Sequence, residues 1–226
     1  MNSKWNDILT SDAIYLLPCL LKWCYDLVIT RKVSKVSPGL YHYKGSGDKT
    51  ILVLHGMHSY PFLMHSISKL ASKSGPVFSV RLSYDKSNPS IHRIKLKKVL
   101  NKIEKDFGYH EFILIGHSMG GIESAHLGFV DKDPRVKGVI AIASRLKYDE
   151  KGRKCLKSCL NDIHTAIQSS DLPLYQIAGK KDWNASIDSM IVRKESSHII
   201  ESAHHFDILF HKELKRKIEE VLNQWS

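Results

Sequence analysis

The chain has 226 residues, of which 42% are hydrophobic and 25% are charged. This length is sufficient for one well-buried globular domain, and the composition excludes a repeat or low-complexity protein. Lysine and arginine (34) outnumber aspartate and glutamate (23), and the net charge of +11 favours anionic partners. The basic residues are spread along the chain and match no zinc-finger, RNA-binding or phosphate-loop pattern, so a nucleic-acid partner is not expected.

Residues 1–39 are interpreted as an apolar, helical N-terminal segment that precedes the domain. The stretch SDAIYLLPCLLKWCYDLVIT lacks the positive start and the cleavage site of a secretory signal. Pro18, Lys22 and Asp26 interrupt it, which argues against a membrane span, and on a helix they form a narrow polar stripe. The wide apolar face can pack on the domain, lie in a lipid interface or cover an active-site mouth. These three alternatives stay open.

The four cysteines fall in two pairs, Cys19 with Cys24 and Cys155 with Cys159. Neither pair has a convincing partner set for zinc, and the second pair is one helical turn apart, so no metal site is expected. We interpret all four as free structural thiols. Thiols of this kind favour a reducing compartment, and a cytoplasmic location is therefore expected, with membrane association through the N-terminal segment as the alternative.

Residues 40–226 are predicted to form a single domain in which short apolar runs alternate with helix-like segments. The predicted strands are 51–55, 77–82, 112–116, 138–144, 173–179 and 198–203, with 40–45 as an added antiparallel edge strand. The predicted helices lie near 62–73, 91–107, 119–128, 155–169 and 211–224. Several strands are apolar on both pleat faces, as in a parallel sheet that helices cover on both sides. The pattern predicts a doubly wound, mostly parallel α/β sheet.

The sequence GHSMG, residues 116–120, joins a predicted central strand to a predicted helix. A strand that turns abruptly into a helix brings backbones close together, and side chains at Gly116 or Gly120 would clash there. Such a turn lifts the Ser118 oxygen clear of the sheet at the start of the helix. The unsatisfied N–H groups of that helix end suit a developing oxyanion, so Ser118 is interpreted as a nucleophile.

In this setting the motif resembles the nucleophile turn of the α/β-hydrolase superfamily, specifically its small serine esterases and lipases. The resemblance covers about residues 48–225 and implies an α/β-hydrolase fold, hydrolysis through an acyl-enzyme, and no cofactor or metal. The family's H-G-x loop is similar to LVLHGMHS, and this implies oxyanion N–H donors on Met57 and Met119. The extended H-G-G-G form is absent, since Met57 and His58 follow Gly56.

The same resemblance implies a base and an acid in the chain order serine, acid, histidine. The stretch ESAHHFDIL resembles the family's H-F ending, so His205 is the expected base, with His204 as the neighbour that could displace it. His198 lies in a predicted strand and His211 in a predicted helix, and both are interpreted as structural.

Asp182 is the expected acid, because the family commonly carries it in a loop like the one that follows Gly179. Two lysines precede Asp182, so a solvated turn aspartate is the alternative reading. Asp149 is the chief rival, since some family members carry the acid after the preceding strand. Asp207 follows the histidine too closely to support it.

The interval 145–171 between two predicted strands holds at most one amphipathic helix, which predicts a small or minimal cap. An open site of this kind favours apolar or acyl-lipid esters as small-molecule substrates. A thioesterase or amidase, and a hydrolase fold that binds a ligand without turnover, are the alternatives. The first half of the interval can attract anionic headgroups or form a solvated face. Its basic residues are Arg145, Lys147, Lys151, Arg153, Lys154 and Lys157.

Overall fold

The computed structural model describes residues 33–57, 59–82, 89–150 and 154–225, together with Leu20, Leu21, Trp23 and Cys24. In this part of the chain one sheet of eight strands runs through the molecule in the order β1-β2-β4-β3-β5-β6-β7-β8. From β4 to β8 every neighbouring pair is parallel, while β1, β2 and β4 pair antiparallel. The strands are β1 Val33–Ser37, β2 Leu40–Tyr43, β3 Ile51–Leu54, β4 Val77–Val80, β5 Phe112–His117, β6 Val136–Ile142, β7 Leu174–Gly179 and β8 Ser197–Ile200.

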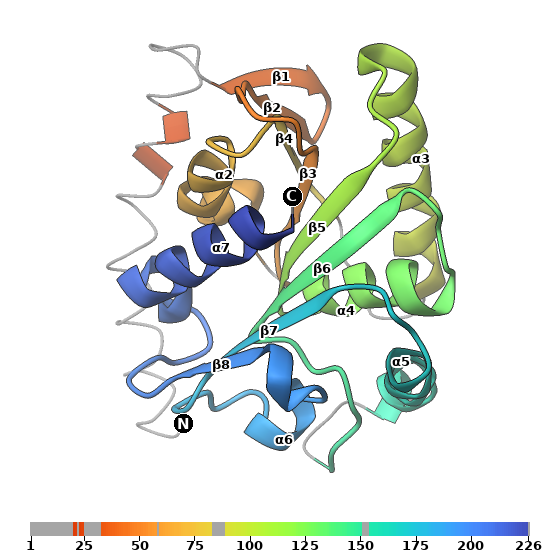
Figure 1. Cartoon of the computed structure of the whole chain (residues 1–226), viewed down its shortest axis with the longest axis vertical. Coiled ribbons are helices and arrows are strands. Elements are labelled where there is room, and N and C mark those ends of the chain that lie inside the picture. Colours follow the sequence, from red (N-terminus) through yellow and green to blue (C-terminus); the bar gives the residue numbers. More distant parts are fainter. Residues whose placement is uncertain are drawn as a thin grey trace, which may run out of the picture.

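Helices cover both faces of the sheet (Figure 1), α2 and α7 on one side and α3, α4 and α5 on the other. The helices are α2 His65–Ala71, α3 Pro89–Phe107, α4 Met119–Ala125, α5 Lys157–Gln168, α6 Ile187–Met190 and α7 Lys212–Gln224. Shorter turns of 3-10 helix lie at Pro61–Met64, Lys154–Leu156, Lys194–Ser196 and Asp207–Phe210, and a π turn at His126–Val130 extends α4. This is the doubly wound, mostly parallel arrangement that the sequence predicts.

The strand pleat divides the core into two apolar layers. In β3, Ile51 and Val53 face α2 and α7, whereas Leu52 and Leu54 face α3, α4 and α5, and all four are fully buried. The neighbouring strands β5 and β6 alternate in the same way. Since both faces of these central strands need apolar side chains, the strands are apolar throughout, and this is why the sequence predicted them well.

The two N-terminal strands differ from expectation. The strand predicted at 40–45 exists as β2 and is antiparallel, but it lies inside the sheet rather than at its edge, because β1 pairs with its outer side. No strand was predicted at Val33–Ser37, within the range assigned to the N-terminal segment. Three of its five residues, including Ser34 and Lys35, are polar, and four of the five are at least partly exposed, so its apolar pattern is weak.

Ahead of β1, four residues of the predicted N-terminal segment belong to the described part of the chain, and all four are helical. The Trp23 ring lies 5.1 Å from the ring of Tyr41 in β2 and 6.4 Å from that of Phe62, so Trp23 packs on the domain. Leu20 and Leu21 are exposed. The polar stripe predicted from Pro18, Lys22 and Asp26 lies outside the described residues. No described helix has both the length and the apolar character needed to cross a membrane.

Three of the four cysteines are described, and each is a free thiol. Cys24 and Cys155 are exposed, whereas Cys159 is half-buried on α5. Burial raises the pKa of Cys159 to about 11, so its thiol stays protonated and unreactive at neutral pH. Cys19 lies outside the described residues.

The interval between β6 and β7 holds one helix, as predicted, with residues 151–153 outside the described part, Lys151 and Arg153 among them. That helix, α5, buries Leu160, Ile163 and Ile167 in the core layer that α3 and α4 share. The helix α5 therefore covers one face of the sheet. The candidate site lies at the carboxyl ends of the strands.

Candidate active site

Ser118 occupies a strained turn between β5 and α4. Its backbone has φ 54° and ψ −119°, a left-handed conformation that a residue with a side chain rarely adopts. The surrounding structure holds it there: the Ser118 N–H donates to the carbonyl of Ile142 in β6 at 2.9 Å. Its own carbonyl accepts from the N–H groups of Gly121 and Ile122 at 3.0 and 3.2 Å. The strain therefore serves to present the Ser118 side chain, which is partly exposed.

Close backbone contacts require glycine at positions 116 and 120, as the sequence predicted. A Cβ on Gly116 would lie 2.3 Å from the carbonyl oxygen of Gly120, and a Cβ on Gly120 would lie 2.5 Å from that of Leu54 in β3. Both obstacles are backbone atoms, which cannot move aside as a flexible side chain would. The turn can therefore close only with glycine at both positions.

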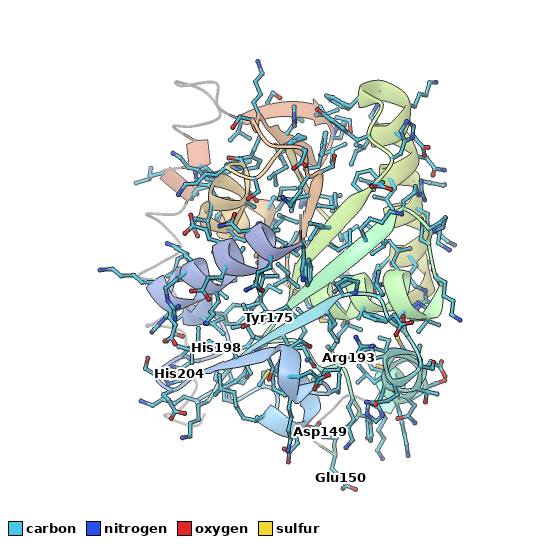
Figure 2. The ribbon with its side chains drawn as sticks, viewed as in Figure 1. Asp149, Glu150, Tyr175, Arg193, His198 and His204 are labelled. Carbon is cyan, nitrogen blue, oxygen red and sulfur yellow. The ribbon has the colours of Figure 1, made fainter. Side chains whose placement is uncertain are left out.

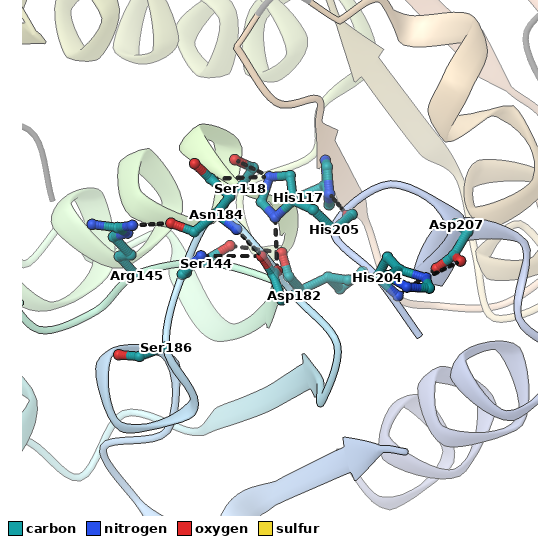
Figure 3. A network of polar contacts seen from close by, with 12 residues as sticks. His117, Ser118, Ser144, Arg145, Asp182, Asn184, Ser186, His204, His205 and Asp207 are labelled. Carbon is teal, nitrogen blue, oxygen red and sulfur yellow. Dashed lines mark hydrogen bonds and ion pairs between the residues drawn. The ribbon is translucent and has the colours of Figure 1, made fainter. Parts of the chain in front are cut away.

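His205 lies directly beside Ser118, in the loop after β8. Its Nε2 is 3.0 Å from the Ser118 hydroxyl oxygen, and its Nδ1 is 2.7 Å from a carboxylate oxygen of Asp182 (Figure 3). Because the carboxylate can only accept, the Nδ1 carries the proton and the Nε2 of the neutral ring is an acceptor for the serine proton. The structure thus brings together the three side chains that the sequence predicted as nucleophile, acid and base.

Asp182 follows β7 in the loop predicted to carry the acid. Its side chain is fully buried, and the other carboxylate oxygen accepts the backbone N–H groups of Asn184 at 2.7 Å and Ala185 at 3.0 Å. The carboxylate is therefore hydrogen-bonded on both oxygens. These bonds aim it at His205, and the solvated-turn reading of Asp182 is wrong.

The other late histidines, of which Figure 2 labels His198 and His204, have different partners. Both the backbone N–H and the ring of His204 contact the carboxylate of Asp207, at 2.6 and 2.9 Å. His198 in β8 lies 2.6 Å from Glu213 of α7, and His211 lies 3.0 Å from the hydroxyl of Ser202. Each is thus held by local contacts.

Asp149, the rival acid, belongs to a clamp on the loop that carries Asp182. It accepts from the guanidinium of Arg145 at 2.7 Å and from the hydroxyl of Ser186 at 2.7 Å. Burial alone would raise the pKa of Asp149, but the Ser186 hydrogen bond and the Arg145 charge outweigh it and lower that pKa. Arg145 also donates to the carbonyl oxygen of Asn184. The pair therefore ties the loop after β6 to the acid loop after β7.

Two further buried histidines support the site and were not singled out as functional in the sequence. His117, next to the nucleophile, donates its Nε2–H to the carbonyl of His205 at 2.8 Å, while its Nδ1 has no hydrogen-bond partner in the described structure. His55 accepts the N–H of Leu82 at its Nε2. Burial, reinforced by the neighbouring imidazole of His205, lowers the pKa of His117 to about 3, and burial is also the main cause that lowers the pKa of His55 to about 4. Both rings are neutral at physiological pH.

The loop and the helix start that carry the predicted oxyanion donors lie beside Ser118. A Cβ on Gly56 would come within 3.1 Å of the Ser118 Cβ, so the loop that carries Met57 passes close to Ser118. Met119 is the first residue of α4, where backbone N–H groups have no acceptor within the helix. In the described turns and loops, neither N–H donates to a backbone carbonyl. His58, the next residue of the loop, lies outside the described part of the chain.

Asn184 and Trp183 complete the surroundings of His205, and neither was predicted. The Asn184 side-chain nitrogen is 3.3 Å from the His205 Nε2. The Trp183 ring lies 5.8 Å from the His205 ring and remains exposed. In the described part of the chain, no group of three or more histidine, cysteine, aspartate or glutamate side chains is arranged to hold a metal ion.

The sequence profile of the serine aminopeptidase (S33) family matches residues 91–212, which include Ser118, Asp182 and His205. The chain belongs to this family of α/β-hydrolases. No curated protein sequence is significantly similar to it.

Solved structures with the same fold include an esterase from Pyrococcus furiosus, which is 19% identical, with a TM-score of 0.64 over 82% of this chain and 86% of that one. A lipase-esterase related protein from Clostridium acetobutylicum is 16% identical, with a TM-score of 0.65 over 85% and 99%. A fluorophosphonate-binding serine hydrolase from Staphylococcus aureus is 15% identical, with a TM-score of 0.60 over 81% and 92%. At these identities the likeness shows the α/β-hydrolase fold, as the sequence resemblance implied.

Proposed function

We propose that this protein is a serine hydrolase that cleaves carboxylic esters with apolar acyl groups, acyl lipids among them. The observation that carries the proposal is the hydrogen-bonded line from Asp182 through His205 to Ser118, with distances of 2.7 and 3.0 Å. A serine hydroxyl is a weak nucleophile without a base, and a base needs a partner that stabilises its charged form. The structure holds all three side chains within hydrogen-bond distance of one another in turn, Asp182 to His205 and His205 to Ser118.

In the proposed reaction the Ser118 oxygen attacks the ester carbonyl carbon while His205 takes the hydroxyl proton. The N–H groups of Met57 and Met119 stabilise the negative oxygen of the tetrahedral intermediate. The intermediate then expels the alcohol, which leaves with the proton from His205, and an acyl-enzyme remains on Ser118. Water, deprotonated by the same histidine, releases the carboxylic acid. No step requires a metal or a cofactor.

The surroundings of the site favour esters over the substrate that the family's name describes. An aminopeptidase must bind the positive amino terminus of a peptide, and a carboxylate is the natural partner for it. Among the described residues, the three carboxylates of the site's polar network are already engaged: Asp182 with His205, Asp149 with Arg145 and Asp207 with His204. The exposed ring of Trp183 beside the base supports an apolar substrate instead.

Hydrolysis of p-nitrophenyl esters with short to long acyl chains tests the proposal, with wild type and Ser118→Ala compared by rate and by thermal unfolding. We expect turnover in wild type to exceed that of the variant by at least about 10⁴-fold. The chain-length optimum would separate an esterase from a lipase. Equal rates in two folded proteins would contradict the serine mechanism and favour a binding protein.

The same two proteins, tested with acyl thioesters and with aminoacyl p-nitroanilides, distinguish the alternatives. The anilide is included because the family is named for aminopeptidase activity. Faster turnover of an aminoacyl anilide than of any ester, abolished by Ser118→Ala, would retain the nucleophile and overturn the ester substrate.

A further inference from the structure

The contact between Asn184 and the base is unexplained by the three-residue mechanism. The Asn184 side-chain nitrogen lies 3.3 Å from the His205 Nε2, the same atom that lies 3.0 Å from the Ser118 oxygen (Figure 3). A neutral imidazole with its proton on Nδ1 presents a single lone pair at Nε2. Because an acceptor faces it, the asparagine must offer its NH2 group and not its oxygen. Two donors therefore share one lone pair.

The backbone of Asn184 is anchored independently of its side chain. Its N–H donates to Asp182, and its carbonyl accepts from the guanidinium of Arg145. Two residues further on, Ser186 donates to Asp149, which itself pairs with Arg145. These bonds preorganise the loop, so the amide is held beside the reacting atoms without depending on its own contact with His205.

We propose, on the basis of the proposed function, that Asn184 is a further catalytic residue whose side-chain NH2 binds the leaving-group oxygen of the ester. In acylation His205 takes the Ser118 proton and becomes a donor at Nε2, and the lone pair that faced the amide is gone. The oxygen that will receive this proton must then lie within hydrogen-bond reach of Nε2. The Asn184 amide lies beside that same atom, so it can donate to this oxygen.

The step balances without any other reactant. The bond between the carbonyl carbon and the leaving oxygen breaks, the electron pair goes to that oxygen, and the proton moves to it from the His205 Nε2. The Asn184 N–H donates a hydrogen bond throughout and is not transferred. Its contribution grows with the negative charge that the leaving oxygen develops, because hydrogen bonds to charged acceptors are stronger than neutral ones. The matching ligand class is an ester of an alkyl alcohol, a poor leaving group.

This charge dependence supplies the test. Two esters of the same acid are compared, one with p-nitrophenol, a good leaving group, and one with an alkyl alcohol, a poor one. We expect Asn184→Leu to lower kcat/KM for the alkyl ester by about tenfold or more and for the p-nitrophenyl ester by less than about threefold. The ratio kcat/KM reports the steps up to acylation, in which the leaving group departs.

A variant in the same loop serves as the matched control. Ser186→Ala removes the hydrogen bond to Asp149 but no contact with His205, so it is expected to lower both rates by the same factor. Asn184→Ala, with its thermal unfolding measured beside that of Asn184→Leu, separates the lost donor from a packing defect and should show the same preference. Equal losses on both esters in the two folded Asn184 variants would overturn the role of Asn184.

Ser118→Ala, assayed on the same two esters, keeps the two proposals distinct. If it abolishes both activities while the Asn184 variants show no leaving-group dependence, the serine hydrolase stands and the role of Asn184 falls. If it leaves both activities intact, the proposed function falls and takes the role of Asn184 with it.

Discussion

Asp182 and Asp149 follow neighbouring strands, and the sequence alone offers both as the acid. In the structure only Asp182 touches His205, whereas Asp149 pairs with Arg145 and Ser186. We expect Asp182→Asn to lower kcat by about 10⁴-fold, because the amide cannot hold the proton of His205 on Nδ1. Asp149→Asn, which weakens the loop clamp only, should lower kcat by less than about tenfold.

Steady-state kinetics on one p-nitrophenyl ester, with thermal unfolding as the control for folding, measures both variants. A loss in Asp149→Asn as large as that in Asp182→Asn would show that the acid had been assigned to the wrong strand.

The residues that could be predicted at this scale are those tied to a local pattern. Ser118 lies within its glycine motif, Asp182 in a loop after a strand, and His205 before a phenylalanine near the end of the chain. His117 and Asn184 carry no such signal, because their roles come from contacts with His205 across 88 and 21 positions of sequence. The sequence left His204 as an alternative to His205, because the turn in which the His204 N–H donates to Asp207 is not visible in a local pattern.

The packing of α4 against the sheet depends on contact between backbones. A methyl group on Gly120 would meet the carbonyl oxygens of Leu54 and His55 at 2.5 and 2.7 Å, so α4 and β3 would have to separate. We expect Gly120→Ala to lower the free energy of unfolding by at least about 3 kcal/mol, the upper part of the range for overpacked sites. Urea unfolding monitored by circular dichroism measures the change.

Gly108→Ala is the matched control, since Gly108 has φ +75° but nothing within 4 Å of its Cβ position. It should cost only the conformational penalty of about 1 kcal/mol. Similar losses in the two variants would show that the close approach at Gly120 costs no more than a backbone penalty, and would contradict the expected separation of α4 from β3.

At the scale of elements, burial on both faces decided what the sequence could predict. The central strands β3, β5 and β6 and the long helix α3 have strong apolar periodicity and were found close to their true ends. The strand β1, which is largely exposed at the sheet edge, and the four-residue helix α6 have too few buried positions for a periodic signal. The strand β1 forms because it pairs with β2, and α6 forms within the loop that follows Asp182. Neither cause is visible in a local sequence pattern.

For the molecule as a whole, the buried histidines set a dependence of stability on pH. His55 and His117 have pKa values of about 4 and about 3 in the folded protein, below the ordinary value of about 6.5. As the pH falls below about 6.5, the unfolded chain takes up protons that the native state does not, and the free energy of unfolding decreases. Above that pH both states are neutral, and the histidines have no such effect.

Between pH 8 and pH 5 each of these two histidines should therefore remove about 2 kcal/mol from the free energy of unfolding. We expect the loss in His117→Gln to be smaller than in wild type by that amount, since glutamine does not titrate. Urea unfolding of both proteins at the two pH values measures the difference. An equal loss in the two proteins would show that protonation of His117 does not contribute.

The net charge of +11 was the least informative property at this scale, because the basic residues are spread along the chain and match no recognition motif. The doubly wound architecture, in contrast, followed from the alternation of strands and helices along the chain. The order of strands in the sheet and the pairing of β1 with the outer side of β2 could not be predicted, because they depend on contacts between strands that a local pattern does not report.

The contact between Ser118 and His205 joins residues 87 positions apart, one after β5 and the other after β8. Between them in the sheet lie β6 and β7, each of which must be in register before the histidine loop can reach the serine. A chain with this half of the sheet unformed holds an ordinary, inert hydroxyl. On the proposed function, a reagent that labels only an activated serine would therefore measure the fraction of correctly folded molecules during renaturation, in a mixture with misfolded ones.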